Sequence, residues 1–166
     1  MTVDEVKKGV CSWINSLDIG VQAIVTPTSH QAPEGRYIAV RDIGVEQFGA
    51  PLRARPGTVE NEGDTRFVYT VDLVITEVDG EGDALRDIRG LMQLEPFRNY
   101  ARTHGFTLWT FGDIMNNDVL EGSFWIRQKA FTVKANFVDS IRHSALRAES
   151  VGLSVNSDEF EVTINQ

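Results

Sequence analysis

The sequence predicts an α+β fold, in which an N-terminal helix and a central helix pack on a mainly antiparallel (mixed) sheet. Three observations support this prediction. A capped amphipathic helix opens the chain, several segments alternate apolar and polar residues as strands do, and a second helical pattern separates the strands into two groups. The expected order is helix, strand, strand, helix, strand, strand, followed by a C-terminal strand.

The first helix begins at a capping box, because Thr2 and Glu5 have the spacing for reciprocal hydrogen bonds between side chain and backbone. Apolar residues then recur at helical spacing and form one stripe. They are Val3, Val6, Val10, Trp13, Ile14 and Leu17. Gly20 supplies a stop, and two prolines and a glycine predict a loop over residues 25–35.

Two strands are predicted to form a long hairpin in the first half of the chain. Residues 37–49 (YIAVRDIGVEQFG) interleave Val and Ile with charged residues, and residues 66–78 (RFVYTVDLVITEV) alternate more strictly. Residues 50–65 between them hold two prolines and two glycines. At about 15 residues this connection is longer than most loops of compact domains, so we expect an extended hairpin loop that is functional or disordered.

An acidic turn, VDGEGDALRD, joins the second strand to the central helix and raises the question of a metal or phosphate site. Asp79, Glu81 and Asp83 alternate as the first ligands of a calcium loop do, but the Gly and Glu required at its sixth and twelfth positions are replaced by Ala and Gly. A phosphate loop would need a Lys and a Ser or Thr, which GEGDALR lacks. The turn is therefore predicted to be a corner, with two glycines making the turn and Asp83 capping the helix.

The central helical pattern runs from Ala84 and is expected to end or kink near Glu95, because Pro96 cannot continue the hydrogen-bond ladder. Pro96 suits the first turn of a second helical piece that ends at His104, before Gly105.

The second half of the chain carries the remaining predicted strands. A short strand, TLWTF, precedes a predicted loop over residues 112–122, and a long strand follows over residues 123–141. The apolar parity of that long strand changes near residues 128–130, which predicts a bulge or bend. After a polar stretch, Phe160 and Val162 lie on one face of a last strand, together with Ile164.

The composition is that of a globular protein. The chain has 166 residues, 42% of them hydrophobic and 24% charged, and is expected to form a single domain over residues 1–166, with 141–166 as a C-terminal extension. No apolar run approaches the roughly 20 residues that cross a bilayer. The net charge of −8 opposes a DNA-binding function, which depends on Lys and Arg contacts to phosphates.

The residues that often carry chemistry do not form a recognisable site. His30, His104 and His143 have no His or Cys partner at zinc spacing. Cys11 is the only cysteine, which excludes an internal disulfide and fits a reducing cytosol. It lies beside the apolar stripe of the first helix, although two nearby lysines leave a nucleophilic role open. We expect no catalytic residue, metal or cofactor.

Two surface features have two interpretations each. The loop at 50–65 and a basic cluster at 141–147 are either solvated surface or subunit contacts, in which the basic cluster would face the acidic corner at 77–87 of a neighbour. The candidate interface residues are Arg53, Arg55, Glu77, Asp79, Glu81, Arg142 and Arg147.

Four segments, together with the order of elements, carry a family resemblance. They are YIAVRDIGVEQFGAP, FVYTVDLVITEVDGEGDALRDI, HGFTLWTFGDI and FWIRQKAFTVKANF. In these segments the chain resembles the neck/tail terminator family of tailed bacteriophages, over about Val3 to Phe137.

The resemblance implies a structural protein of the virion, without catalytic residues. Such proteins form a ring, typically of six copies, that caps the completed tail tube and joins it to the neck or head. The implied partners are copies of the chain itself, the tail tube protein, the sheath protein of some tails and a head-completion or neck connector protein. DNA would pass through the lumen without specific binding, and assembly would take place in the host bacterial cytoplasm.

Three alternatives stay open at this point. The first is another phage tail or head-completion protein, such as a tube or connector protein. The second is a small soluble enzyme or ligand-binding domain with a pocket over the sheet, and the third is a nucleic-acid-binding module.

Overall fold

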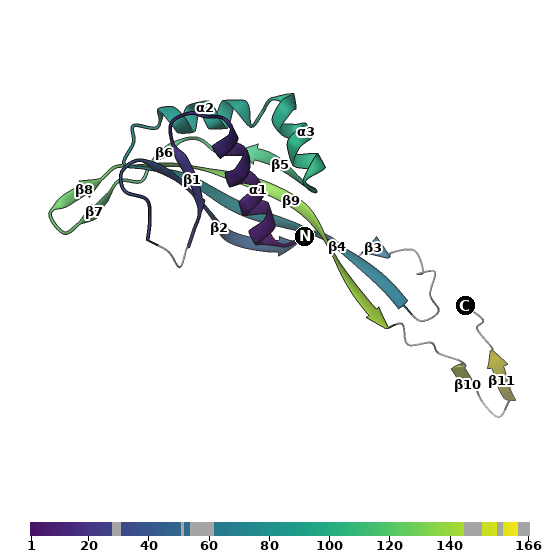
Figure 1. The fold of residues 1–166 in the computed structure, drawn as a ribbon. Coiled ribbons are helices and arrows are strands. Elements are labelled where there is room, and N and C mark those ends of the chain that lie inside the picture. Colours follow the sequence, from purple (N-terminus) through teal and green to yellow (C-terminus); the bar gives the residue numbers. More distant parts are fainter. Residues whose placement is uncertain (28–30, 51, 54–61, 145–150, 156–157, 163–166) are drawn as a thin grey trace. The chain divides into compact units, whose positions relative to one another are not determined.

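The computed structural model describes residues 1–27, 31–50, 52–53, 62–144, 151–155 and 158–162 (Figure 1). Contacts within the chain divide it into two units. The first unit comprises Met1–Pro51 with Phe67–Asp139, and the second comprises Leu52–Arg66 with Ser140–Gln166. The structure confirms the predicted α+β class with a mixed, mostly antiparallel sheet.

The first unit holds the helices of the described chain and most of the main sheet. The helices are α1 (Val3–Ser16), α2 (Asp83–Leu91) and α3 (Glu95–Thr103). The strands that belong wholly or mostly to this unit are β1 (Gln22–Val25), β2 (Tyr37–Gln47), β4 (Glu62–Val78), β5 (Phe106–Phe111), β6 (Met115–Asn116), β7 (Val119–Glu121), β8 (Phe124–Ile126) and β9 (Gln128–Ser144).

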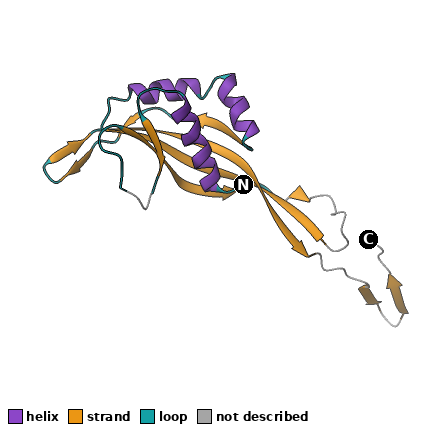
Figure 2. Cartoon of the chain, viewed as in Figure 1, coloured by secondary structure: helices purple, strands orange, loops and turns teal. Residues whose placement is uncertain are grey.

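The main sheet has the order β1-β2-β4-β9-β5, and β6 pairs with β9 beside it. The pair β1–β2 is parallel, whereas β2–β4, β5–β9 and β6–β9 are antiparallel. The β2–β4 pairing confirms the predicted long hairpin, and its register shifts at a bulge between Asp42 and Gly44. Figure 2 shows the helices gathered on one side of this sheet.

The second unit contains short strands. β3 (Leu52–Arg53) pairs with β4 at Thr65 and Arg66, and β10 (Val151–Val155) forms an antiparallel hairpin with β11 (Asp158–Val162). β11 confirms the predicted final strand up to Val162, and β10 was missed within the polar stretch before it. Ile164 lies outside the described residues.

The predicted capping box of α1 is present. Thr2 Oγ1 accepts a hydrogen bond from the Glu5 backbone N–H at 3.3 Å, and Glu5 Oε2 accepts one from the Thr2 backbone N–H at 2.7 Å. The apolar stripe faces the sheet, and Trp13 meets Phe97 of α3 edge to face with ring centroids 4.4 Å apart. Helix α1 therefore closes the core over β1, β2 and α3.

Strict alternation along β4 and β9 fills the core from the sheet side. Val71, Leu73 and Ile75 of β4 are fully buried, as are Phe131 and Val133 of β9. These odd-numbered residues of the two strands therefore face the helices, as the period of two predicts.

Several bounds of the sequence prediction need correction. Residues 22–25 form β1, which overlaps the start of the predicted loop and adds a parallel edge strand. The predicted loop at 112–122 contains β6 and β7. Helix α2 ends at Leu91, earlier than expected, and α3 begins at Glu95 with Pro96 in its first turn, as predicted.

In the predicted long strand over residues 123–141, the structure has a change of sheet in place of the expected bulge. The break lies at Arg127, because β8 pairs with β7 in a separate hairpin whereas β9 joins the main sheet. The alternation with odd-numbered residues buried belongs to β9, whereas no residue of β8 is buried. The parity therefore changes where the chain passes from one sheet to the other.

Replacement of Phe97 by alanine tests the packing of α1 on α3. Phe97 is 1% exposed, so Phe97→Ala is expected to lower the free energy of unfolding by about 3–5 kcal/mol in chemical denaturation. The adjacent Arg98 is exposed, and Arg98→Ala is expected to change that free energy by less than about 0.5 kcal/mol. Equal losses in both variants would contradict this assignment of the core.

Candidate assembly surfaces

The acidic corner, residues 77–87, is organised by one buried carboxylate. Glu77 is 0% exposed, and its Oε2 accepts a hydrogen bond from the Leu85 backbone N–H at 3.1 Å. Leu85 is the third residue of α2, where an N-cap side chain normally accepts the hydrogen bond. Glu77 reaches this N–H from the end of β4 and thereby caps a helix that starts five residues after the strand ends.

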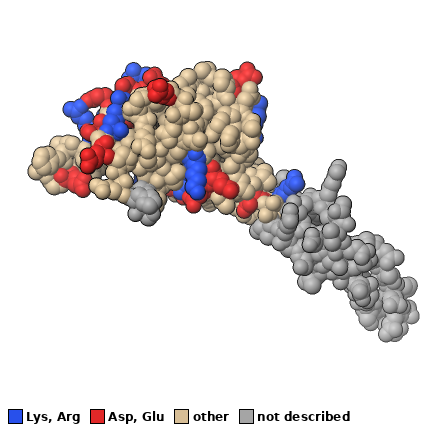
Figure 3. Space-filling view, viewed as in Figure 1, with Lys and Arg blue, Asp and Glu red and all other residues tan. Residues whose placement is uncertain are grey.

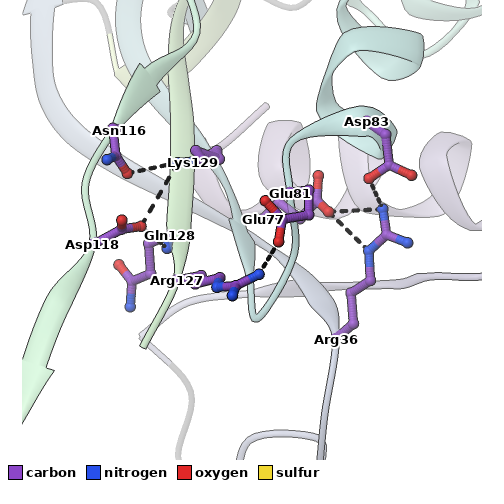
Figure 4. Close-up of polar contacts among 9 residues, drawn as sticks. All are labelled: Arg36, Glu77, Glu81, Asp83, Asn116, Asp118, Arg127, Gln128 and Lys129. Carbon is purple, nitrogen blue, oxygen red and sulfur yellow. Dashed lines mark hydrogen bonds and ion pairs between the residues drawn. The ribbon is translucent and has the colours of Figure 1, made fainter. Parts of the chain in front are cut away.

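Arg36 supplies the positive charge that a buried carboxylate needs. Its Nε donates to Glu77 Oε1 at 2.8 Å, and its guanidinium also forms an ion pair with Asp83 (Figure 4). The predicted cap on α2 was Asp83, but the N-cap residue is Gly82, which has no side chain to offer. Asp83 is instead the first helical residue and contributes through Arg36 and its favourable place at the positive end of the helix.

The glycines of the corner are needed for two different reasons. A Cβ on Gly80 would lie 2.8 Å from Glu77 Cγ and would overlap the carboxylate group, so the buried pair leaves no room for a side chain there. Gly82 has φ +88°, a left-handed conformation that favours glycine. The prediction that both glycines make the turn is confirmed, and the reason at Gly80 is the carboxylate.

The corner also fixes the base of the β7–β8 hairpin. The Asp79 backbone N–H donates to the Arg127 carbonyl oxygen at 2.8 Å, and the Arg127 side chain forms an ion pair with Glu81 (Figure 4). Because Arg127 is the single residue between β8 and β9, these contacts hold one leg of the hairpin at the point where it leaves the main sheet.

A second set of contacts holds the other leg. Asp118 Oδ1 accepts a hydrogen bond from the Gln128 backbone N–H at 2.8 Å, and the Asn117 backbone N–H donates to the Gln128 carbonyl oxygen at 2.8 Å. The hydrogen bond from Gln128 holds the pKa of Asp118 below its usual range. Lys129 Nζ donates to Asn116 Oδ1 at 2.8 Å, so both legs of the hairpin are joined at their base.

The β7–β8 hairpin beyond this base exposes a large apolar surface. Leu120 is 54% exposed, Phe124 is 77% exposed and Trp125 is 68% exposed, and Val119 beside them is also exposed. Figure 3 shows the hairpin as a mostly tan projection with few charged atoms. Contiguous exposed apolar residues of this kind mark interaction sites on folded proteins. A smaller exposed set on and just after β2 consists of Ile43, Val45 and Phe48.

An open groove of about 790 Å³ lies between α1 and the end of α3. Gly9 and Ser12 form part of its α1 wall, and Tyr100 and His104 form part of its α3 wall. The Tyr100 hydroxyl donates to the Gly9 carbonyl oxygen at 3.1 Å, and the His104 ring stacks on the Tyr100 ring with centroids 4.0 Å apart. These contacts fix the shape of the groove without filling it.

The three acidic candidate residues, Glu77, Asp79 and Glu81, all lie at the acidic corner. Asp79 and Glu81 are exposed at the corner, whereas Glu77 lies beneath them. Its burial removes the Glu77 side chain from the residues that a neighbouring subunit could touch directly.

The four basic candidates are described in part or not at all. The backbones of Arg53 and Arg142 belong to β3 and β9, and their side chains are outside the described set. Arg55 and Arg147 lie outside the described residues altogether. The expected pairing of this basic cluster with the acidic corner of a neighbour stays a prediction.

Comparison with known protein families gives one decisive match. A family model described as phage neck terminator protein matches residues 4–163 of the 166. This chain belongs to the phage neck terminator family. Among curated proteins, none matches the chain significantly.

Membership of the neck terminator family implies a structural protein of the bacteriophage virion, of a kind not known for enzymatic activity. The surroundings of Cys11 agree with a structural role. The thiol is buried, and burial raises its pKa to about 12, so the nucleophilic thiolate is not formed near neutral pH. Nearby Lys7 is itself paired with Asp4 and Asp42, at 2.8 and 2.7 Å.

As far as the structure describes them, the three histidines of this neck terminator offer no support for a catalytic or metal site. His104 stacks on Tyr100, His30 lies outside the described residues, and the side chain of His143 is not described. Within the described ranges, no three His, Cys, Asp or Glu side chains are grouped as a metal site. No described helix is long and apolar enough to cross a membrane.

The β7–β8 hairpin is the surface of this neck terminator that sequence reasoning missed. Its signal was present in VLEGSFW, where an apolar pair stands on each side of a two-residue turn at Gly122 and Ser123. Gly122 has φ +61°, as the first residue of a tight hairpin turn often does.

Replacement of Gly80 by alanine tests the role of the buried carboxylate. The new Cβ must displace Glu77 from Arg36 and from the end of α2, so the free energy of unfolding is expected to fall by about 3 kcal/mol. This is the lower end of the range for a broken buried pair, because Arg36 is partly exposed. Urea denaturation of the purified chain gives the measurement.

Gly90 in α2 provides the matched control, since a Cβ there meets nothing within 4 Å. Gly90→Ala is expected to stabilise the chain by up to about 1 kcal/mol through helix propensity. A neutral Gly80→Ala variant would show that the corner does not depend on the position of Glu77.

Proposed function

We propose that this chain is a tail terminator, in which six copies form a ring that caps the completed tail tube and joins it to the neck or head. The observation that carries the proposal is membership of the phage neck terminator family over residues 4–163. The other partners are the tail tube protein, the sheath protein where the tail has one, and a head-completion or connector protein.

The surface of the chain supports a function through assembly. The apolar hairpin exposes Phe124 and Trp125 just after its turn, and aromatic residues of this kind often dominate the energy of protein interfaces. Its base is held by the acidic corner and by Asp118, so little conformational freedom is lost when the hairpin docks. A pre-positioned apolar projection of this kind fits a subunit that has to join others in a fixed orientation.

The charge of the chain supports a role along the path of the genome. Its net charge is −8, and phosphates are repelled by an acidic surface. DNA would therefore pass through the lumen of the proposed ring without adsorbing to it. Assembly of the ring takes place in the host cytoplasm, before the finished tail joins the head.

Removal of the gene from the phage is expected to give tails of uncontrolled length that do not join heads, because nothing stops growth of the tube. Electron micrographs of lysates give the length distribution. Addition of the purified chain to isolated tubes is expected to place a ring at one tube end and to stop further growth.

Two results would contradict the proposal. Mutant lysates without any tubes would assign the chain to the tube itself, and tubes of normal length that lack heads would assign it to a connector. Tubes that stay uncapped in the presence of excess folded chain would also count against a terminator.

A further inference from the structure

We propose that the β7–β8 hairpin of one copy docks into the groove between α1 and α3 of the next copy. This inference rests on the proposed function, because it names the contact that would join neighbouring subunits of the ring. The occupant of the groove is thus a second copy of the same chain.

The hairpin needs a partner with an apolar concave surface. Among the large apolar residues whose side chains the structure describes, Phe124 and Trp125 are the most exposed. Each aromatic side chain can bury about 150–250 Å² when it docks. The groove of about 790 Å³ lies within the range of about 300–1,000 Å³ typical of sites that hold a buried group, and its lining is mostly apolar.

The charges at the two surfaces are complementary. Glu121 is the charged residue of the two hairpin strands, and it pairs with Phe124 next to the turn. Lys8 lies exposed on the α1 wall of the groove. Neither side chain has an ion pair within the described part of the chain, so each is available to a neighbour. The groove's acidic residue, Glu5, is already engaged in the capping box of α1.

A chain cannot place its own hairpin in its own groove. The hairpin joins β9 at Arg127, just before the strand begins. The groove is lined by Val138, which lies near the point where β9 leaves the first unit. At about 3.3 Å per residue, a strand covers about 35 Å between these positions. Figure 1 shows β7–β8 far from the start of α1 within the first unit.

Two different, complementary surfaces at opposite ends of one folded unit produce head-to-tail contacts. Contacts of this kind form a closed ring when the rotation between neighbours returns to the first copy. The hairpin and groove therefore give the geometry that a ring of identical subunits requires.

The test uses three variants of the full chain. Phe124→Ser with Trp125→Ser removes the apolar hairpin surface, and Ser12→Trp fills the groove from its exposed α1 wall. The control is Leu94→Ser, which removes an exposed apolar side chain at the N-cap of α3, where serine is a favourable residue. Far-UV circular dichroism checks that each variant is folded.

The expected readout comes from analytical ultracentrifugation and from negative-stain images of tube ends. The hairpin variant alone and the groove variant alone stay monomeric and form no ring, whereas the wild type and Leu94→Ser assemble. An equal mixture of the hairpin and groove variants gives dimers and nothing larger, because one intact groove then meets one intact hairpin.

A charge exchange provides a second, milder test. Glu121→Lys alone or Lys8→Glu alone is expected to weaken association by at least about fivefold, because the exposed ion pair is lost and two like charges then face each other. A chain that carries both substitutions restores association to within about twofold of wild type, because the pair is re-formed with its charges exchanged.

The failure of this inference is distinct from the failure of the proposed function. Hairpin and groove variants that still form normal rings would overturn the inference and leave the terminator function standing. Rings that form without the hairpin but no longer bind tube ends would assign the hairpin to the tail tube and also overturn it. A wild-type chain that neither self-associates nor caps tubes would contradict the function itself.

Discussion

The corner that joins β4 to α2 in the first unit depends on one buried carboxylate, Glu77. An unpaired charge in a protein interior is strongly destabilising, so Glu77 has to keep both Arg36 and the Leu85 backbone N–H as partners. These two requirements fix where α2 begins and keep Gly80 free of a side chain. The corner held in this way then binds Arg127 and sets the base of the β7–β8 hairpin. A single desolvated group thus connects the end of β4 with the exposed apolar hairpin.

The sequence predicted the parts of the fold that depend on local chemistry. The capping box at Thr2 and the alternation of β4 follow from neighbouring residues, and both are confirmed. Glu77 shares the parity of Leu73 and Ile75, so the same alternation already placed it on the buried face. It was predicted as an interface residue because it belongs to the acidic corner, and its partner Arg36 is 41 residues away in sequence.

The short strands could not be predicted in the same way. Strands of three or four residues, such as β1 and β7, carry too little periodicity to be separated from loops. β8 lies within the predicted strand 123–141, but its pairing with β7 instead of the main sheet is decided by tertiary contacts. The hairpin surface was missed for this reason. Its exposed Phe124 and Trp125 are costly for a lone subunit, since they favour non-specific association, and they are reasonable in a subunit that buries them on assembly.

An electron cryomicroscopy reconstruction of the assembled ring tests the central claim most directly, namely that the corner holds an apolar hairpin in place for a neighbouring copy. The account predicts that Glu77 keeps Arg36 as its partner and that Trp125 of each subunit is buried between α1 and α3 of the next. A ring in which Trp125 stays in solvent, or in which the hairpin leaves the corner to pack elsewhere, would contradict it.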